Sequence, residues 1–185
     1  NTFQHVYCLR AESSLAASRL DVRLFGHEFG IMRSDNRHRM AIGTMTGTSI
    51  DALDVAIARI HGCGLEMTVE LVAHGQTPMG ELEAPLRAAA DQTPMTATEF
   101  ARLAHRFGSL HAKSIQSLTN TYGVTPDLIC LHGQTIAHEP PAGWALLDTA
   151  PLLPCFGCPI VTDLRLVDMA HGGQGAPITP LADWI

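Results

Sequence analysis

The sequence predicts a mixed α/β domain on the basis of three observations. Short alternating runs come first and indicate strands, a helical stretch follows, and short, strongly apolar runs come last. The 185 residues are 46% hydrophobic and 16% charged, which is enough apolar content to bury a sizeable core. Successive strands that precede the helices fit a mixed α/β layer better than a strict alternation of strand and helix.

Three short strands are expected first. The apolar run 40–42 leads into a small, polar turn at 43–49, and the alternating run 53–58 follows. A turn at 62–64 with two glycines precedes a third alternating run at 67–72. Strands this close in sequence can pair as an antiparallel meander.

Two helices are expected next, at 81–90 and 96–121. In the second, apolar and small residues recur at intervals of three and four, as in a helix with one buried face. Thr96 and Glu99 form the sequence signature of a capping box at its start, and Gly123 is suited to end it.

The last part of the chain predicts further strands. The continuous apolar run 127–131 is typical of a strand buried on both faces, and it leads into a loop at 132–135. Two more strands are expected at 144–147 and 159–162. The tetrapeptide His-Gly-Gln-Thr occurs at 132–135 and also at 74–77, but the flanking residues differ, and we interpret the duplication as chance.

Residues 1–39 differ from the rest of the chain. Their periodicity is weak and their end is polar and rich in arginine, so we interpret them as an extension of unknown role. A short helix is expected within them at 11–22, because the apolar residues there follow helical spacing.

Composition narrows the class of partner. Twelve basic and eighteen acidic residues give a net charge of −6, and no basic cluster stands out, so we expect neither a nucleic acid nor a membrane as partner. The most apolar stretch, 144–161, is broken by Asp148 and three prolines, so no transmembrane helix is expected. Five cysteines are an odd number for a disulfide framework, and no signal peptide is apparent, so a cytoplasmic location is expected.

The strongest local motif is the segment 43–54, Gly-Thr-Met-Thr-Gly-Thr-Ser-Ile-Asp-Ala-Leu-Asp. Glycines let a backbone approach an anion, hydroxyls donate to phosphate oxygens, and carboxylates can hold a metal ion. A Walker-type P-loop is excluded, because Thr48 follows Gly47 and the only lysine is Lys113. The phosphate-binding hairpin of the actin-like, sugar-kinase and chaperone ATPases has no such lysine, and an ordinary hairpin turn is the alternative.

Three segments together carry a family resemblance. They are Gly-Thr-Met-Thr-Gly-Thr-Ser-Ile-Asp from Gly43, Leu-His-Gly-Gln-Thr-Ile from Leu131, and Thr-Asp-Leu-Arg-Leu-Val-Asp-Met-Ala-His-Gly-Gly-Gln-Gly-Ala-Pro from Thr162. In this order they closely resemble the anhydro-N-acetylmuramic acid kinases, over residues from about 40 to 181. The resemblance implies an actin-like (hexokinase-type, ribonuclease H-like) ATPase lobe with a mixed sheet, here incomplete.

The resemblance also implies an activity. Family members open the ring of 1,6-anhydro-N-acetylmuramic acid with water and phosphorylate O6, using ATP and Mg²⁺, to give N-acetylmuramic acid 6-phosphate for peptidoglycan recycling. The ATP-binding segment of the family matches eight residues here. They are Gly47, Thr48, Ser49, Ile50, Asp51, Ala52, Leu53 and Asp54.

Six residues are assigned to the sugar substrate: His132, Gln134, Thr135, Asp163, Arg165 and Asp168. The first three follow a buried strand, where open α/β sheets place ligand groups. Arg165 is suited to a forked contact with the lactyl carboxylate of a muramic sugar. The alternatives are a capped turn at 132–135 and a surface ion pair among the two aspartates and Arg165.

The chain departs from the family pattern in three places. Ala52 replaces a glycine that usually follows the Gly-Thr-Ser-x-Asp core, and Val167 replaces an arginine in the Asp-x-Arg-x-x-Asp motif. The general-base aspartate of the family lies in an Asp-Cys-Gly-Pro-Gly-Asn motif that would come after Ile185. We therefore interpret 40–185 as an N-terminal lobe truncated before the second lobe, assign no catalytic residue, and expect no kinase activity from it alone.

Two other interpretations remain open. The first is a non-catalytic ligand-binding or interaction module derived from the kinase lobe, and the resemblance also admits a homodimer of the full-length protein. The second rests on Cys155 and Cys158, a C-x-x-C pair. Flanking prolines do not suit a redox helix, and no second pair is present for zinc, so two half-buried thiols and no metal ligands are expected.

Overall fold

The computed structural model describes residues 23–24, 27–28 and 38–177. The expected helix at 11–22 and the last residues of the stretch that resembles the family, 178–181, lie outside the described residues. The strands are β1 (Arg23–Leu24), β2 (His27–Glu28), β3 (Arg39–Thr46), β4 (Ala52–His61), β5 (Thr68–Pro78), β6 (Leu128–Leu131), β7 (Gln134–Glu139), β8 (Ala142–Leu146) and β9 (Ile160–Val161). The helices are α1 (Glu83–Ala90), α2 (Ala97–Tyr122) and α3 (Leu164–Ala170), with 3₁₀ turns η1 (Gly64–Glu66), η2 (Gly80–Leu82) and η3 (Ala150–Leu152).

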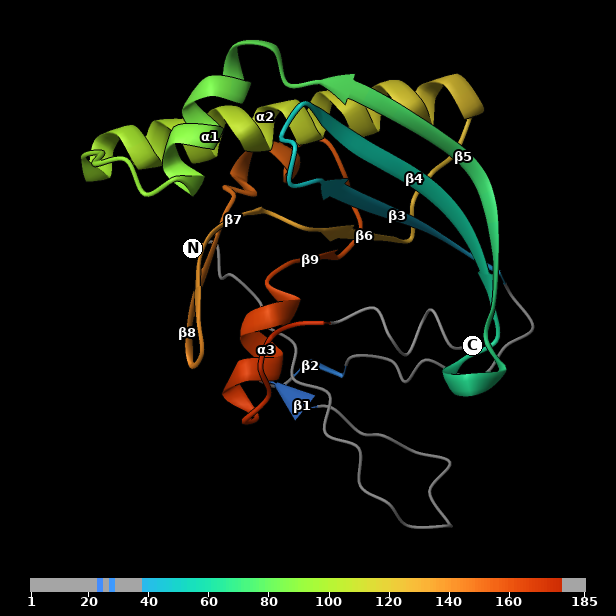
Figure 1. Cartoon of the computed structure of the whole chain (residues 1–185). Helices are drawn as coiled ribbons and strands as arrows, with labels where there is room; N and C mark the ends of the chain where they lie inside the picture. Colours follow the sequence, from blue (N-terminus) through green and yellow to red (C-terminus); the bar gives the residue numbers. More distant parts are fainter. Residues whose placement is uncertain (1–22, 25–26, 29–37, 178–185) are drawn as a thin grey trace.

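A five-stranded mixed sheet forms the centre of the fold, in the order β5-β4-β3-β6-β9 (Figure 1). Strands β3, β4 and β5 are antiparallel neighbours, so the expected meander is confirmed. Strands β6 and β9 continue the sheet in parallel to β3, so the runs at 127–131 and 159–162 join it, whereas the run at 144–147 belongs to β8 outside this sheet. The predicted mixed α/β class is therefore correct.

The turn between the first two long strands is shorter than expected. Strand β3 continues to Thr46, which pairs with Leu53, so only 47–51 connect the strands and the expected turn at 43–49 is wrong over its first half. The reason is the alternation of the two faces: Thr44 and Thr46 are buried on the core side of the strand. The small, polar residues at these positions therefore belong to the strand and do not form a turn.

Helix α2 packs on one face of the sheet, against β4 and β5, and α1 packs against α2 and strand β7 (Figure 1). The capping box is confirmed, because Thr96 accepts from the main-chain N of Glu99 and the Glu99 carboxylate accepts from Thr96. Gly123, with φ of 64°, ends α2 in the left-handed conformation, as expected. The core lies between helices and sheet; its fully buried large side chains include Ile42, Leu53, Ile57, Leu86, Phe107, Ile115 and Ile129.

The expected loop at 132–135 is confirmed over its first half and is strand over its second half. His132 and Gly133 form the connection, and β7 begins at Gln134 and pairs with β8 in a separate antiparallel hairpin. A Cβ at Gly133 would lie 2.9 Å from the main-chain O of Leu146, so only glycine allows this close approach to β8. The sheet strand before it, β6, is not buried on both faces as expected: Cys130 is only half-buried.

The segment from β9 onward contains a helix that sequence patterns did not predict. Helix α3 is seven residues long and begins after Asp163, whose φ is 61° and whose side chain makes no capping bond. Without a capping signal and with just under two turns, α3 has no distinct sequence signature. No helix among the described residues has both the length and the apolar character required to span a bilayer.

Candidate active site

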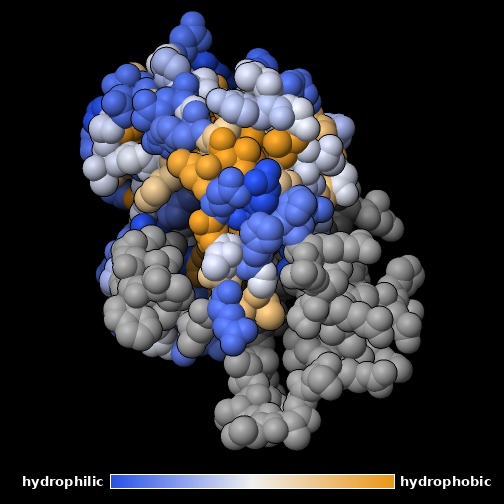
Figure 2. Space-filling model, turned by 90° about the vertical axis from the view of Figure 1, so that its right-hand side faces the viewer, coloured by the Kyte–Doolittle hydropathy of each residue, from blue (hydrophilic) through white to orange (hydrophobic). Residues whose placement is uncertain are grey.

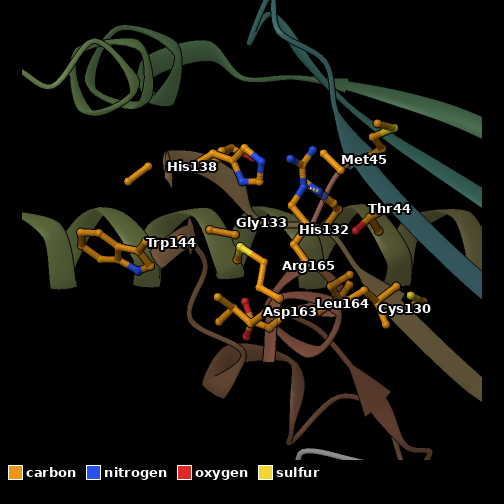
Figure 3. A pocket seen from close by; sticks show the side chains of 18 of the residues that line it. Thr44, Met45, Cys130, His132, Gly133, His138, Trp144, Asp163, Leu164 and Arg165 are labelled. Atoms are coloured by element: carbon orange, nitrogen blue, oxygen red, sulfur yellow. Dashed lines mark hydrogen bonds between the residues drawn. The ribbon is translucent and has the colours of Figure 1, made fainter. Parts of the chain in front are cut away.

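A pocket of about 480 Å³ opens beside the carboxyl end of β6. Five parts of the chain line it: the end of β3, the end of β6 with its link to β7, the β7–β8 hairpin, the start and body of helix α3, and the segment after α3 at 176–177. Figure 3 shows Trp144 at one end of the pocket and Met45 at the other, with Arg165 and His132 between them. Most of the lining is apolar, so the few polar side chains determine which ligand groups fit.

Arg165 and His132 form the polar centre of this pocket. The Arg165 Nε donates to His132 Nε2 at 3.2 Å. Because a guanidinium only donates, His132 Nε2 must carry a lone pair and its proton must lie on Nδ1. Burial, and then the charge of Arg165, lower the pKa of His132, so the imidazole is held neutral.

The guanidinium of Arg165 keeps part of its donor capacity. Within the described residues only its Nε is hydrogen-bonded, to His132, which leaves the two terminal nitrogens for a ligand. A planar fork of this kind matches a carboxylate. Asp163 lies in the same pocket; burial raises its pKa, while His132 acts in the opposite direction.

The other assigned sugar residues take different positions. Thr135 lines the pocket. Gln134 is buried and directs its amide nitrogen to the main-chain O of Thr135 at 3.3 Å. Asp168 does not line the pocket; its carboxylate accepts from the main-chain N of Gly175 at 2.7 Å and thereby holds the glycine-rich loop that follows α3. The three charged residues form no ion pair with one another in the described part of the chain.

The hairpin between β3 and β4 forms an ordered turn. Ile50 N donates to Gly47 O at 3.1 Å, and the Ser49 hydroxyl donates to Asp51 Oδ1 at 2.5 Å. That hydroxyl is the main cause of the lowered pKa of Asp51. Gly47, Thr48 and Ser49 are exposed at the tip and accessible to a phosphate group, whereas the side chains of the assigned Ile50 and Leu53 are buried in the core.

The replacement at Ala52 is tolerated by the backbone. Ala52 is the first residue of β4, and the positive φ of this turn, 53°, falls on Ile50 instead. Glycine is therefore not required at 52. The side chain of Ile50 is 3% exposed and fixes the turn to the core, although a β-branched residue rarely adopts this conformation.

Asp54 is held by residues that sequence reasoning did not assign. It lies on β4, and its Oδ1 accepts from His74 Nε2 at 3.0 Å and from Gln76 Nε2 at 2.8 Å. Both partners belong to the first copy of His-Gly-Gln-Thr, which lies on β5 next to β4. The repeat of this tetrapeptide is the sequence feature that could have pointed to His74 and Gln76. Trp144, whose ring contacts that of Phe100 at a tilt of 49° with centroids 5.0 Å apart, was also not assigned.

Strand β3 connects the β3–β4 hairpin to the pocket. Met45 of β3 lines the pocket, and the hairpin segment begins two residues later at Gly47. None of the residues 47–54 lines the pocket itself. The arrangement therefore places a polar, glycine-containing turn next to a separate, mostly apolar pocket with a cationic centre.

Comparison with known proteins decides the family. Residues 39–185 match the family described as anhydro-N-acetylmuramic acid kinase. The chain belongs to the anhydro-N-acetylmuramic acid kinase family. A kinase family implies binding of ATP and of a substrate that accepts phosphate.

Individual anhydro-N-acetylmuramic acid kinases are similar to the chain over most of its length. The protein of Caldanaerobacter subterraneus subsp. tengcongensis is 32% identical over 165 residues, covering 82% of this chain and 42% of the relative. That of Methylobacterium nodulans is 36% identical over 162 residues, covering 76% and 43%, and that of Synechococcus elongatus is 35% identical over 153 residues, covering 78% and 40%. The chain thus spans about two fifths of the length of these curated relatives.

Proposed function

We propose that this chain supplies the phosphate-binding hairpin and part of the sugar site of an ATP-dependent anhydro-N-acetylmuramic acid kinase. The observation that carries the proposal is the placement of the two motifs: the hairpin assigned to ATP and the pocket assigned to the sugar adjoin through β3. In the reaction implied by the family, water opens the anhydro ring and O6 of the sugar receives the phosphoryl group. A donor site and an acceptor site must then be neighbours.

The fold supports the finer assignment to an actin-like ATPase lobe spanning residues 40–185. An antiparallel meander of three strands continued by strands parallel to the first gives the order β5-β4-β3-β6-β9. This topology places the β3–β4 hairpin and the end of β6 at the same edge of the sheet, because β3 and β6 run in the same direction. Ligand groups gather at such an edge.

The hairpin has donor groups that fit the phosphates of ATP and, with them, Mg²⁺. Asp51 and Asp54 each use Oδ1 for contacts inside the protein, which leaves one oxygen without a partner in the described part of the structure. Magnesium keeps several waters and is commonly bound by one or two carboxylates together with substrate phosphates. When bound, the ion would neutralise charge on the transferred phosphoryl group.

In the pocket, we assign the residues separate tasks. Arg165 binds the carboxylate of the sugar through its two terminal nitrogens, and His132 fixes the plane of the guanidinium. The apolar lining removes water from around this contact, which strengthens it. We also place the protein in the cytoplasm, where ATP is available; the four described cysteines are free thiols, as in a reducing compartment.

Binding of two related sugars to the chain tests the sugar site. We expect 1,6-anhydro-N-acetylmuramic acid to bind at least about tenfold more tightly than 1,6-anhydro-N-acetylglucosamine, which lacks the lactyl carboxylate. Arg165→Gln should remove this preference, and Arg102→Gln, on the exposed side of α2, should preserve it. Equal affinity of the unsubstituted chain for the two sugars, measured by calorimetry, would refute the assignment of Arg165.

A further inference from the structure

Arg87, on helix α1, contacts the hairpin from outside its own strands. Its Nη2 donates to the main-chain O of Ser49 and also lies 3.2 Å from Glu83 Oε1, one helical turn earlier. Ser49 is a tip residue of the segment assigned to phosphate. No sequence motif of that segment includes Arg87, since the two positions are separated by 38 residues.

The contact falls where the hairpin lacks other support. On one side the tip is fixed by the buried Ile50 side chain, and after the tip Met79 N donates to Asp51 O at 2.9 Å. Gly47, Thr48 and Ser49 are exposed, so their packing contributes little to holding the tip. The left-handed conformation at Ile50 persists only where surrounding contacts determine it, and the guanidinium supplies such a contact at the preceding residue.

Arg87 also brings positive charge to an acidic segment. Residues 43–58 contain Asp51 and Asp54 and no lysine or arginine. The charge of Arg87 contributes, after the hydrogen bonds of Ser49 and the backbone, to the lowered pKa of Asp51. A phosphate group approaching the tip would meet two carboxylates, and a fixed guanidinium beside them reduces the repulsion.

We propose that Arg87 is a positioning residue for the phosphate-binding hairpin: it holds the main chain at Ser49 in the binding conformation and offsets the adjacent carboxylates. The proposal rests on the proposed function of the hairpin. Since a preorganised loop binds an anion without first being ordered, loss of Arg87 should weaken phosphate binding more than it weakens folding.

Three variants of the chain test this role: Arg87→Gln, Arg87→Lys and Arg106→Gln. The last is the matched control, because Arg106 forms a comparable exposed ion pair with Glu81 at 3.3 Å, away from the hairpin. In the absence of ligand, amide hydrogen exchange at Ile50 should be about tenfold faster in Arg87→Gln than in Arg106→Gln. With Mg²⁺ and inorganic triphosphate, Arg87→Gln should bind about tenfold more weakly, and Arg87→Lys should recover part of the affinity.

The outcomes separate this proposal from the one on which it rests. Unchanged exchange at Ile50 in Arg87→Gln would overturn the positioning role, as would faster exchange with unchanged triphosphate affinity. Equal melting temperatures of Arg87→Gln and Arg106→Gln are expected, so a selective loss of melting temperature in Arg87→Gln would indicate a merely structural contact. If the unsubstituted chain binds no triphosphate, the proposed function of the hairpin fails, whatever the exchange rates show.

Discussion

His111 is the most unusual single residue of the core. Its side chain is fully buried on α2, its ring meets Phe107 edge to face at 4.5 Å, and neither ring nitrogen has a hydrogen-bond partner among the described residues. Burial first, and then the proximity of His132, lower its pKa to about 3. The folded chain therefore holds this imidazole neutral, whereas the unfolded chain titrates it near 6.5.

This difference predicts a pH dependence of stability. Between pH 6.5 and about pH 3 the unfolded state binds a proton that the folded state does not, so the free energy of unfolding falls as pH is lowered through this window. Urea unfolding of the chain at pH 7.5 and pH 5.5 should show a loss of about 1.4 kcal/mol from His111 alone. His111→Leu should reduce the loss by this amount.

The same variant has a second expected effect. Replacing an imidazole with two unpaired nitrogens by an apolar side chain of similar size should leave stability at pH 7.5 unchanged or raise it. His61→Leu, at the exposed end of β4, is the matched control and should keep the pH dependence of the unsubstituted chain. A His111→Leu chain with that same pH dependence would show that His111 has a partner or is hydrated.

At the residue scale, the location of a side chain could be predicted from the sequence where the end of a strand determines it. His132 and Thr135 follow β6, and Arg165 lies in the first turn of α3 shortly after β9, so these residues meet in the pocket at one end of the parallel strands. The contacts of Asp168 and Arg87 could not be predicted in this way. Their contacts, with Gly175 N and Ser49 O, depend on the course of a loop and on the packing of a helix, and neither has a pattern in sequence.

At the element scale, the long helix α2 depends on a glycine in its middle. A Cβ built at Gly108 would lie 1.9 Å from the main-chain O of Asp148, so the segment before η3 rests directly on the helix backbone. Asp148 N also donates to Ala104 O at 3.3 Å, one turn earlier. The helix thus packs against this segment without an intervening side chain.

Gly108→Ala should therefore destabilise the chain by about 2 kcal/mol or more, because Asp148 would have to move. This loss opposes the gain of about 1 kcal/mol that alanine brings to a helix interior. Lys113→Ala, at an exposed position of α2, should change the free energy of unfolding by less than about 0.5 kcal/mol. If Gly108→Ala unfolds at the same urea concentration as the unsubstituted chain, the backbone contact is not formed.

Helices and strands were predicted accurately where nearby residues in the sequence mark their ends. Helix α2 was predicted to within one residue at each end, because its capping box and terminal glycine are local. The end of β3 was predicted wrongly. Residues Gly43 to Thr46 have the composition of a turn, and they form a strand only because β4 and β6 pair with them. Helix α3 and the β7–β8 hairpin likewise owe their form to contacts with distant residues, such as Gly143 against Met169.

At the scale of the whole molecule, the sheet is covered unevenly. Helix α2 packs on one face, but Val69 and Leu71 of β5 are 60% and 65% exposed. Leu71 pairs with Ala58, whose side of β4 is opposite to that of the buried Leu53 and Val55, so these side chains point away from the helices. Figure 2, which views the right-hand side of the molecule in Figure 1, shows hydrophobic surface interrupted by hydrophilic side chains.

Strand β5 is also an edge strand of the five-stranded sheet, so it combines exposed apolar side chains with unpaired main-chain groups. Edges of this kind recruit other strands. We expect the chain to associate with increasing concentration, and the double substitution Val69→Lys with Leu71→Lys to shift it toward monomer in light scattering coupled to size exclusion. Leu153→Lys changes an exposed leucine away from this edge and should leave association unchanged. If the unsubstituted chain stays monomeric at every concentration, or if Leu153→Lys has an equal effect, then β5 is not the surface through which the chain associates.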